Sequence, residues 1–128
     1  MVRRSYEAIL RGDVDEGLSV LDPDVRWDGV GGVEPCIGRD EVEHNVRQMV
    51  ERAASFVVEE VVDGGGRVLV ALRPGDPAAF ERADLPEPYL GSDRLFNVVT
   101  VRDGKVVHLE DHLSRREALA SIGVPADS

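Results

Sequence analysis

The chain has 128 residues, which is the usual size of one domain with a single hydrophobic core. Its composition, 42% hydrophobic and 31% charged, excludes a disordered, collagen-like or low-complexity chain. The 25 acidic and 15 basic residues give a formal charge of −10, which repels phosphate backbones and anionic lipids. We therefore expect one domain over residues 1–128, with no nucleic-acid partner and no membrane partner.

The beginning of the chain and its cysteine content predict a cytoplasmic protein. No run of about 18 apolar residues is present, and the first four residues lead into a polar helix rather than a signal-peptide core. The single cysteine, Cys36, has no partner for an internal disulfide, which agrees with a reducing compartment. We interpret Cys36 as a small buried hydrophobic residue.

The first elements in chain order are predicted to be two helices and a strand. Apolar residues at helical spacing predict a first helix over residues 2–11. Asp13 lies three residues before Glu16, a pattern like a capping box, and predicts a short second helix that ends at Pro23. A short strand over residues 24–28 follows and leads into a glycine-rich loop.

A third helix is predicted after this loop. Gly38 and Asp40 mark its beginning, and Glu43 lies three residues beyond the cap. Its apolar stripe faces the core and consists of Val42, Val46, Met49, Val50 and Ala53.

Two hairpins are predicted in the second half of the chain. Residues 55–63 and 67–73 are rich in valine and are joined by three glycines. Residues 95–102 and 105–113 are joined by Asp103-Gly104, which suits the positive φ angles of a tight turn. Consecutive hairpins imply an antiparallel sheet.

The segment 74–91 contains four prolines and is too long for a simple connection. It is predicted to be either a lid at the rim of a site or an ordinary surface insertion. Ser114 and Glu117 form a capping box for a last short helix. Because the strands and helices do not alternate as βαβ units, the fold class is α+β.

The order of these elements resembles the nuclear transport factor 2-like superfamily, in its SnoaL-like and ketosteroid-isomerase-like branch. The resemblance covers nearly the whole chain and implies a cone, in which a curved antiparallel sheet wraps around the N-terminal helices and leaves a mostly apolar pocket. It also implies a homodimer through the outer sheet face. The segments that carry it are Tyr6-Glu7-Ala8 with Gly12-Asp13, Asp22 to Asp28, Gly38-Arg39, and Gly104 to Val107 with Glu110-Asp111-His112.

Asp111 is the first candidate catalytic residue. Alternation along the last strand places Leu109, Asp111 and Leu113 on one face together with Val107, and this apolar face must point to the core. A carboxylate in an apolar interior is unfavourable unless it is hydrogen-bonded, protonated or used in chemistry. The resemblance implies a general acid or base here, and the alternative is a buried Asp that only accepts hydrogen bonds.

Asp28 is the second candidate, because the segment that begins at Asp28 resembles the one that carries the general base of ketosteroid isomerase. The alternative is that Asp28 caps the glycine turn. If Asp28 and Asp111 faced one pocket, mutual repulsion would keep one carboxyl protonated and supply both a base and a proton donor. We therefore predict that these two carboxylates share a cavity.

The expected ligand-binding residues are those near these carboxylates. In ketosteroid-isomerase-like proteins, a Tyr of the first helix and a donor on the strand before the last turn bind the enolate oxygen. In this chain Tyr6 lies one position from the place of that Tyr. Asn97 or Phe96 stands at the place of the second donor. Asn97 can donate a hydrogen bond. The complete expected set is Tyr6, Trp27, Asn97, Leu109 and Leu113.

His108, Glu110 and His112 occupy alternate positions of the last strand, on the face opposite Asp111. A polar outer face against solvent or a dimer mate explains them, so no metal site is predicted. No cofactor-binding motif is expected either.

The resulting functional hypothesis is a cofactor-independent enzyme that acts on a small, largely apolar carbonyl compound. Isomerisation, cyclisation and dehydration by carboxylate acid/base chemistry all agree with the candidate residues. One alternative is a non-catalytic domain that binds a small hydrophobic ligand. Another is a dimeric interaction module that works through its outer sheet face.

Overall fold

The structure, a computed structural model, describes residues 1–30, 34–53, 56–75 and 94–125. Most of the predicted segment 74–91 therefore lies outside the described residues. None of the helices in the described ranges is long and apolar enough to cross a membrane. The elements are α1 (Val2–Leu10), α2 (Val14–Leu18), β1 (Leu21–Asp28), β2 (Cys36–Ile37), α3 (Arg39–Ala53), β3 (Phe56–Asp63), β4 (Arg67–Pro74), β5 (Leu95–Arg102), β6 (Lys105–His112) and α5 (Arg115–Ser121).

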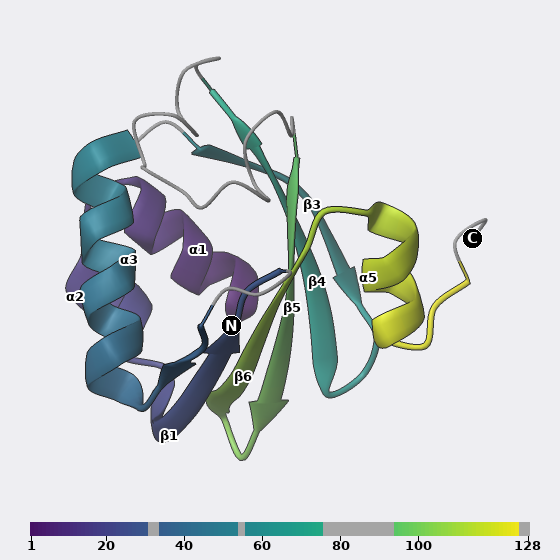
Figure 1. Ribbon diagram of the computed structural model, residues 1–128, viewed down its shortest axis with the longest axis horizontal. Helices are drawn as coiled ribbons and strands as arrows, with labels where there is room; N and C mark the ends of the chain where they lie inside the picture. The colour runs from purple at the N-terminus through teal and green to yellow at the C-terminus, as the bar shows by residue number, and fades with distance from the viewer. Residues whose placement is uncertain (31–33, 54–55, 76–93, 126–128) are drawn as a thin grey trace.

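The strands form one six-stranded sheet in the order β2-β1-β6-β5-β4-β3. The consecutive pairs from β3 to β6 are antiparallel, as predicted from the two hairpins, but β1 and β6 are parallel. The expected antiparallel sheet is therefore corrected to a mixed sheet. The reason is the path of the chain, which leaves β1, passes through α3 and both hairpins, and returns beside β1 in the same direction (Figure 1).

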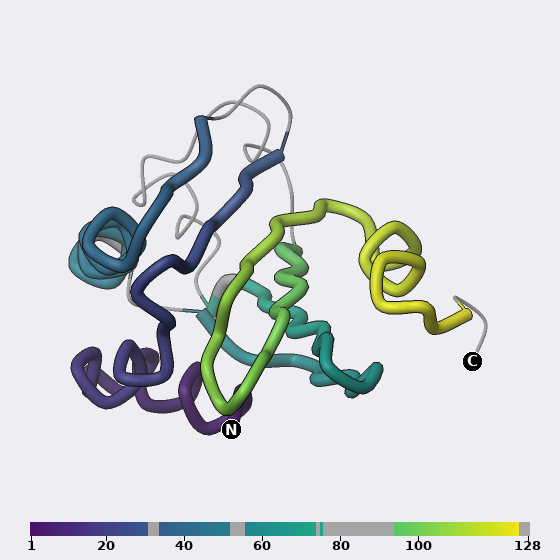
Figure 2. Tube along the Cα trace, turned by 90° about the horizontal axis from the view of Figure 1, so that it is seen from below, coloured from purple at the N-terminus to yellow at the C-terminus, as the bar shows by residue number. Residues whose placement is uncertain are grey.

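Helices cover the two faces of this curved sheet unequally. Figure 1 shows α1, α2 and α3 on one side of the sheet, and α5 on the other. In the view from below, the β5–β6 hairpin separates α5 from the other helices (Figure 2). We call the side of α1 to α3 the inner face and the side of α5 the outer face. The predicted α+β fold with N-terminal helices packed on a curved sheet is confirmed.

Alternation along β4 and β5 supplies a hydrophobic core to each face. Val70 and Leu72 of β4 belong to the inner core, whereas Leu69 and Ala71 belong to the outer core beneath α5. The outer core also contains Phe96 and Val98 of β5, Ala118 and Leu119 of α5, and Ile122 directly after α5. Both β4 and β5 therefore contribute side chains to two separately packed layers.

Local signals at the turn and the helix caps are confirmed. Asp103 and Gly104 have φ angles of 53° and 76°, as expected for a tight hairpin turn between β5 and β6. The side chain of Asp13 accepts a hydrogen bond from the backbone N–H of Glu16 at the start of α2. Ser114 caps α5 in the same way.

The end of the second helix differs from the prediction. α2 ends at Leu18, and Pro23 lies within β1 rather than at the end of a helix. The pairing of β1 with β6 is irregular between Leu21 and Arg26. Proline has no N–H to donate to a neighbouring strand, so it is tolerated in this irregular part of the strand.

A second difference concerns the start of β6. The register between β5 and β6 shifts between Thr100 and Val101, which breaks the simple alternation at this point. Val106 consequently joins the inner core and is only 4% exposed, whereas Val107 had been expected on that face. Beyond the shift the predicted alternation holds for Leu109 and Asp111.

Candidate functional site

The inner face encloses a cavity of about 130 Å³ against the N-terminal helices. An empty space of this size is comparable with the ~150 Å³ cavity that accommodates benzene in an engineered protein core. Most of its lining is apolar. The lining consists of Val2, Ser5, Tyr6, Ile9, Leu10, Gly17, Leu18, Val20, Leu21, Trp27, Val42, Val46, Met49, Val50, Phe56, Leu72, Leu95, Asn97, Val99, Val106 and Leu109.

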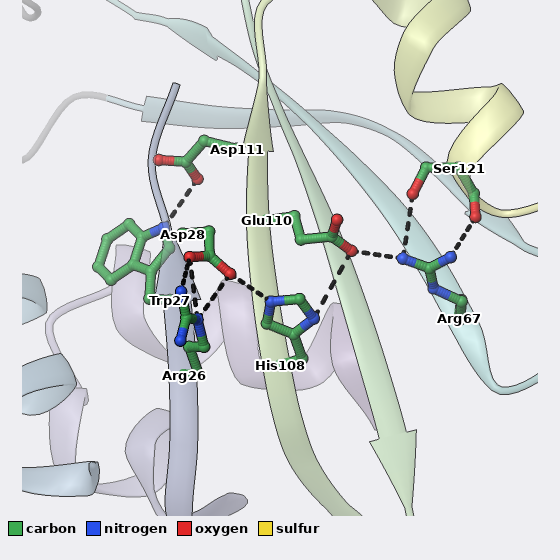
Figure 3. Close-up of polar contacts among 8 residues, drawn as sticks. All are labelled: Arg26, Trp27, Asp28, Arg67, His108, Glu110, Asp111 and Ser121. Atoms are coloured by element: carbon green, nitrogen blue, oxygen red, sulfur yellow. Dashed lines mark hydrogen bonds and ion pairs between the residues drawn. The ribbon is translucent and has the colours of Figure 1, made fainter. Parts of the chain in front are cut away.

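Asp111 is buried beside this cavity, with 8% of its surface exposed. Its Oδ1 accepts a hydrogen bond of 2.8 Å from Trp27 Nε1 and one of 2.7 Å from Asn97 Nδ2. Figure 3 shows the indole of Trp27 directed at the carboxylate. Trp27 and Asn97 line the cavity, as does Leu109 two residues before Asp111 on the same face. Neutral donors thus hold a buried carboxylate next to an apolar space.

Tyr6 extends this group of hydrogen bonds from α1. Its hydroxyl donates to Asn97 Oδ1 at 2.9 Å. The orientation of the Asn97 amide follows from its neighbours, because a carboxylate only accepts and must therefore face the NH₂ group. The amide oxygen then faces Tyr6, so the phenol must be the donor. Four side chains from four elements, Tyr6, Trp27, Asn97 and Asp111, are linked in this way, and we call them the polar cluster.

The Tyr6 phenol keeps its proton. Burial, together with the negative charge of Asp111, raises the pKa of this hydroxyl far above its ordinary value of 10.0. At neutral pH the hydroxyl is therefore protonated and donates a hydrogen bond to Asn97.

We predict that Tyr6 and Asn97 are energetically coupled. Tyr6→Phe should lower the free energy of unfolding by about 1–2 kcal/mol, because the buried Asn97 oxygen loses its donor. In an Asn97→Ala background the same substitution should lower it by less than half as much, since the acceptor is already gone. Urea unfolding of the four proteins measures the coupling, and strictly additive effects would contradict the hydrogen bond.

Asp28 does not join the cavity, which corrects the predicted pairing of the two carboxylates. Trp27 lies opposite Leu109 in the parallel register, so Trp27 faces inward, and Asp28 lies opposite Glu110 and faces outward. Asp28 is partly exposed and bonds to the Arg26 guanidinium at 3.0 Å and to His108 Nε2 at 2.7 Å. Adjacent residues of a strand point to opposite faces, so Asp28 and Asp111 lie on opposite sides of the sheet.

A row of charged and polar side chains continues across the outer face (Figure 3). His108 Nδ1 lies 3.7 Å from Glu110 Oε2, and Glu110 also pairs with Arg67 of β4. Arg67 in turn donates to the backbone carbonyl and the hydroxyl of Ser121 and so ties α5 to the sheet. The outer-face position of His108 and Glu110 agrees with the predicted alternation. The homodimer through this face stays a prediction.

Two carboxylates on the surface make the free energy of unfolding depend on pH in the acidic range. Arg26 and His108 lower the pKa of Asp28, and Arg115 lowers the pKa of Glu60. A carboxyl whose pKa is lower in the folded state contributes stability above its unfolded pKa, near ~4, and loses it as the pH falls further. We therefore expect the free energy of unfolding to fall from about pH 4 downward.

The double variant Asp28→Asn, Glu60→Gln is the control for this pH dependence. It should be less stable than the wild type at pH 7 and should approach it in stability as the pH falls toward 2. Urea unfolding at several pH values measures both curves. Curves that stay parallel would show that neither carboxyl contributes.

Of the two leucines predicted to bind a ligand, only one lines the cavity. Leu109 lines the cavity, whereas Leu113 packs against the inner core and is not part of the described lining. Within the described ranges, no three His, Cys, Asp or Glu side chains are arranged to hold a metal ion together. Cys36 is partly buried, and the Asn45 amide contacts its sulfur; burial raises the pKa of this thiol.

Apart from Tyr6, the helix residues that form walls of the cavity were not predicted as part of the site. The apolar stripe of α3 was predicted, but as core rather than as a cavity wall; its members Val42, Val46, Met49 and Val50 all line the space. On α1, Val2, Ile9 and Leu10 also line the space. Apolar periodicity indicates which side of a helix is buried, but it does not distinguish a packed neighbour from a void.

Comparison with known proteins decides the family. Residues 2–109, most of the chain, match the SnoaL-like domain. The chain belongs to the SnoaL-like domain family. Its fold is that of the nuclear transport factor 2-like superfamily, as the sequence resemblance implied. No curated protein gives a significant match.

Several solved structures share this fold. An NTF2-like protein of unknown function from Burkholderia pseudomallei is 26% identical, with a TM-score of 0.62 over 94% of this chain and 93% of that one. A candidate polyketide cyclase from Sinorhizobium meliloti is 20% identical, with a TM-score of 0.62 over 87% and 93%. A protein of ketosteroid-isomerase-like fold from Catenulispora acidiphila, in complex with trimethylamine, is 12% identical, with a TM-score of 0.60 over 99% and 95%.

Proposed function

We propose that this SnoaL-like protein is a cofactor-independent enzyme that moves a proton on a small, largely apolar carbonyl compound, with Asp111 as the acid/base residue. Isomerisation, cyclisation and dehydration belong to this reaction class. The observation that carries the proposal is one buried carboxylate held by neutral donors at the side of an apolar cavity.

The surroundings of Asp111 suit a general base. Trp27 and Asn97 both donate to Oδ1, which fixes the position of the carboxylate. Both of these donors are uncharged. A carboxylate that is withdrawn from water and held in place can reach a weakly acidic C–H of a ligand in the adjoining space.

The lining of the cavity indicates the kind of substrate. Apolar side chains from α1, α3 and the sheet dominate the walls, and they favour a compact hydrocarbon skeleton. The polar cluster lies at one place on this lining, where Tyr6, Trp27 and Asn97 meet Asp111. A substrate with one polar end and an apolar body would place that end near the carboxylate.

Exchange of α-protons for deuterium tests the proposal without knowledge of the natural substrate. In D₂O, Asp111 would take a proton from the carbon beside the carbonyl, an enolate would form, and a solvent deuteron would return to the same carbon. We expect the protein to accelerate this exchange for members of a panel of small cyclic and aryl ketones, as followed by proton NMR. The same ketones should shift amide resonances of residues that line the cavity.

Absence of any acceleration over buffer, together with ligand-induced shifts at the cavity, would instead support the alternative of a non-catalytic binding domain. Native mass spectrometry of the purified protein would then identify the hydrophobic ligand that it retains.

A further inference from the structure

Most side-chain hydrogen-bond donors among the described residues of the cavity lining are already used within the protein. Among the lining residues that the structure describes, four side chains carry N–H or O–H groups: Ser5, Tyr6, Trp27 and Asn97. The Ser5 hydroxyl donates to the carbonyl oxygen of Gly17 at 2.6 Å. The hydroxyl of Tyr6 donates to Asn97, and the indole N–H of Trp27 donates to Asp111. Each of these three groups has a single hydrogen, so none can donate to a ligand without breaking an internal bond.

Tyr6 also supplies a hydrogen-bond acceptor to the lining. A phenol oxygen that donates its hydrogen can still accept one. In the part of the chain that the structure describes, no donor contacts the Tyr6 oxygen. The Asn97 amide has two hydrogens and donates only one of them to Asp111, so the second can bind a ligand. The lining as described therefore offers a ligand an oxygen acceptor at Tyr6 and a single amide donor at Asn97.

We propose that the cavity takes small apolar molecules that carry a hydroxyl group, and that this hydroxyl donates its hydrogen to the Tyr6 oxygen. The inference deepens the proposed function and rests on it, since it concerns the same cavity. A substrate that has both groups can place its carbonyl oxygen at the Asn97 amide and its hydroxyl at Tyr6. Hydroxy-carbonyl compounds are thus the substrate class.

The role of Tyr6 in this arrangement is the reverse of the one implied by the ketosteroid-isomerase resemblance. A Tyr that binds an enolate oxygen must donate its hydrogen to the substrate. Here Asn97 accepts that hydrogen, and the amide of Asn97 is itself oriented by the Asp111 carboxylate. Asp111 therefore determines, through Asn97, that Tyr6 presents lone pairs rather than a hydrogen to the cavity.

Cyclohexanol and cyclohexanone form a matched pair of probes, because they have the same skeleton and only the alcohol can donate. Their dissociation constants would be measured by NMR titration of the wild type and of Tyr6→Phe. We expect Tyr6→Phe to weaken cyclohexanol binding about 5- to 10-fold, the effect of one hydrogen bond. Cyclohexanone binding should change less than twofold.

Three results would overturn the proposal. Equal weakening of both probes would mean that Tyr6 acts on the shape of the cavity only. Greater weakening of cyclohexanone would mean that Tyr6 donates to the ligand. Failure of the wild type to bind cyclohexanol at millimolar concentration would mean that the cavity does not accept small alcohols.

A comparison in the wild type keeps the test decisive if Tyr6→Phe does not fold. Fluorocyclohexane resembles cyclohexanol in size but cannot donate a hydrogen bond, so cyclohexanol should bind more tightly once each dissociation constant is corrected for the free energy of transfer from water to an alkane; the opposite order would overturn the proposal. These measurements are independent of turnover. Loss of the hydroxyl preference with α-proton exchange intact would reject this inference alone, and the converse result would reject only the enzymatic proposal.

Discussion

The Asp111→Asn variant should lose at least about 100-fold of any α-proton exchange that the wild-type protein catalyses. General acid/base groups typically contribute 10²- to 10⁴-fold to a rate, and an amide cannot take up the proton. The substitution preserves shape, and the new amide oxygen can still accept the hydrogen bonds from Trp27 and Asn97 that Asp111 accepts now. Exchange rates from proton NMR, at equal protein concentration, measure the loss.

Asp28→Asn is the matched control for this substitution. Asp28 undergoes the same chemical change, but it lies on the outer face, where it bonds to Arg26 and His108. Its exchange rate should remain within about twofold of the wild type. An unaffected Asp111→Asn variant would remove Asp111 from the mechanism, and a strong loss in Asp28→Asn would contradict the separation of the two faces.

Truncation of Leu69 should have the largest effect on stability among single core substitutions of β4. Leu69 is fully buried in the outer core beneath α5. Leu69→Ala should lower the free energy of unfolding by about 3–5 kcal/mol, because the substitution removes buried contacts and leaves a new void. Thermal unfolding should show a fall in Tm of roughly 10 °C or more for a chain of this size.

Leu72→Ala, on the same strand, is the control. Leu72 points to the inner face and already borders the cavity, so its side chain has fewer packed neighbours to lose. Its effect should lie near the lower end of the range for such substitutions, about 2 kcal/mol or less. If Leu72→Ala proved the more damaging of the two, the cavity would be absent from the protein in solution.

Local sequence patterns predicted most of the fold because they depend on near neighbours. The Asp103-Gly104 turn and the Asp13 and Ser114 caps need only a few residues, and all three are confirmed. The parallel pairing of β1 with β6 could not be predicted in the same way. It joins strands that are separated by α3 and two hairpins, and no short motif records such a distant pairing.

The candidate site was only partly predictable for a related reason. Alternation in the last strand placed Asp111 on the apolar face, and the same rule applied to Trp27 and Asp28 shows that only one of them can share that face. The resemblance favoured Asp28, whereas the register selects Trp27. The hydrogen bond from Tyr6 to Asn97 spans 91 positions of the chain and depends on packing that periodicity does not encode.

The two-layered packing of β4 and β5 has a consequence for how this protein could diversify. Alternate residues of each strand belong either to the dense layer under α5 or to the inner layer, where Leu72, Leu95, Asn97 and Val99 form part of the cavity wall. Substitutions in the wall would alter the shape of the ligand space while the dense layer keeps the sheet folded. Substrate preference can therefore change through wall positions, each at a moderate cost in stability, while the layer under α5 stays intact.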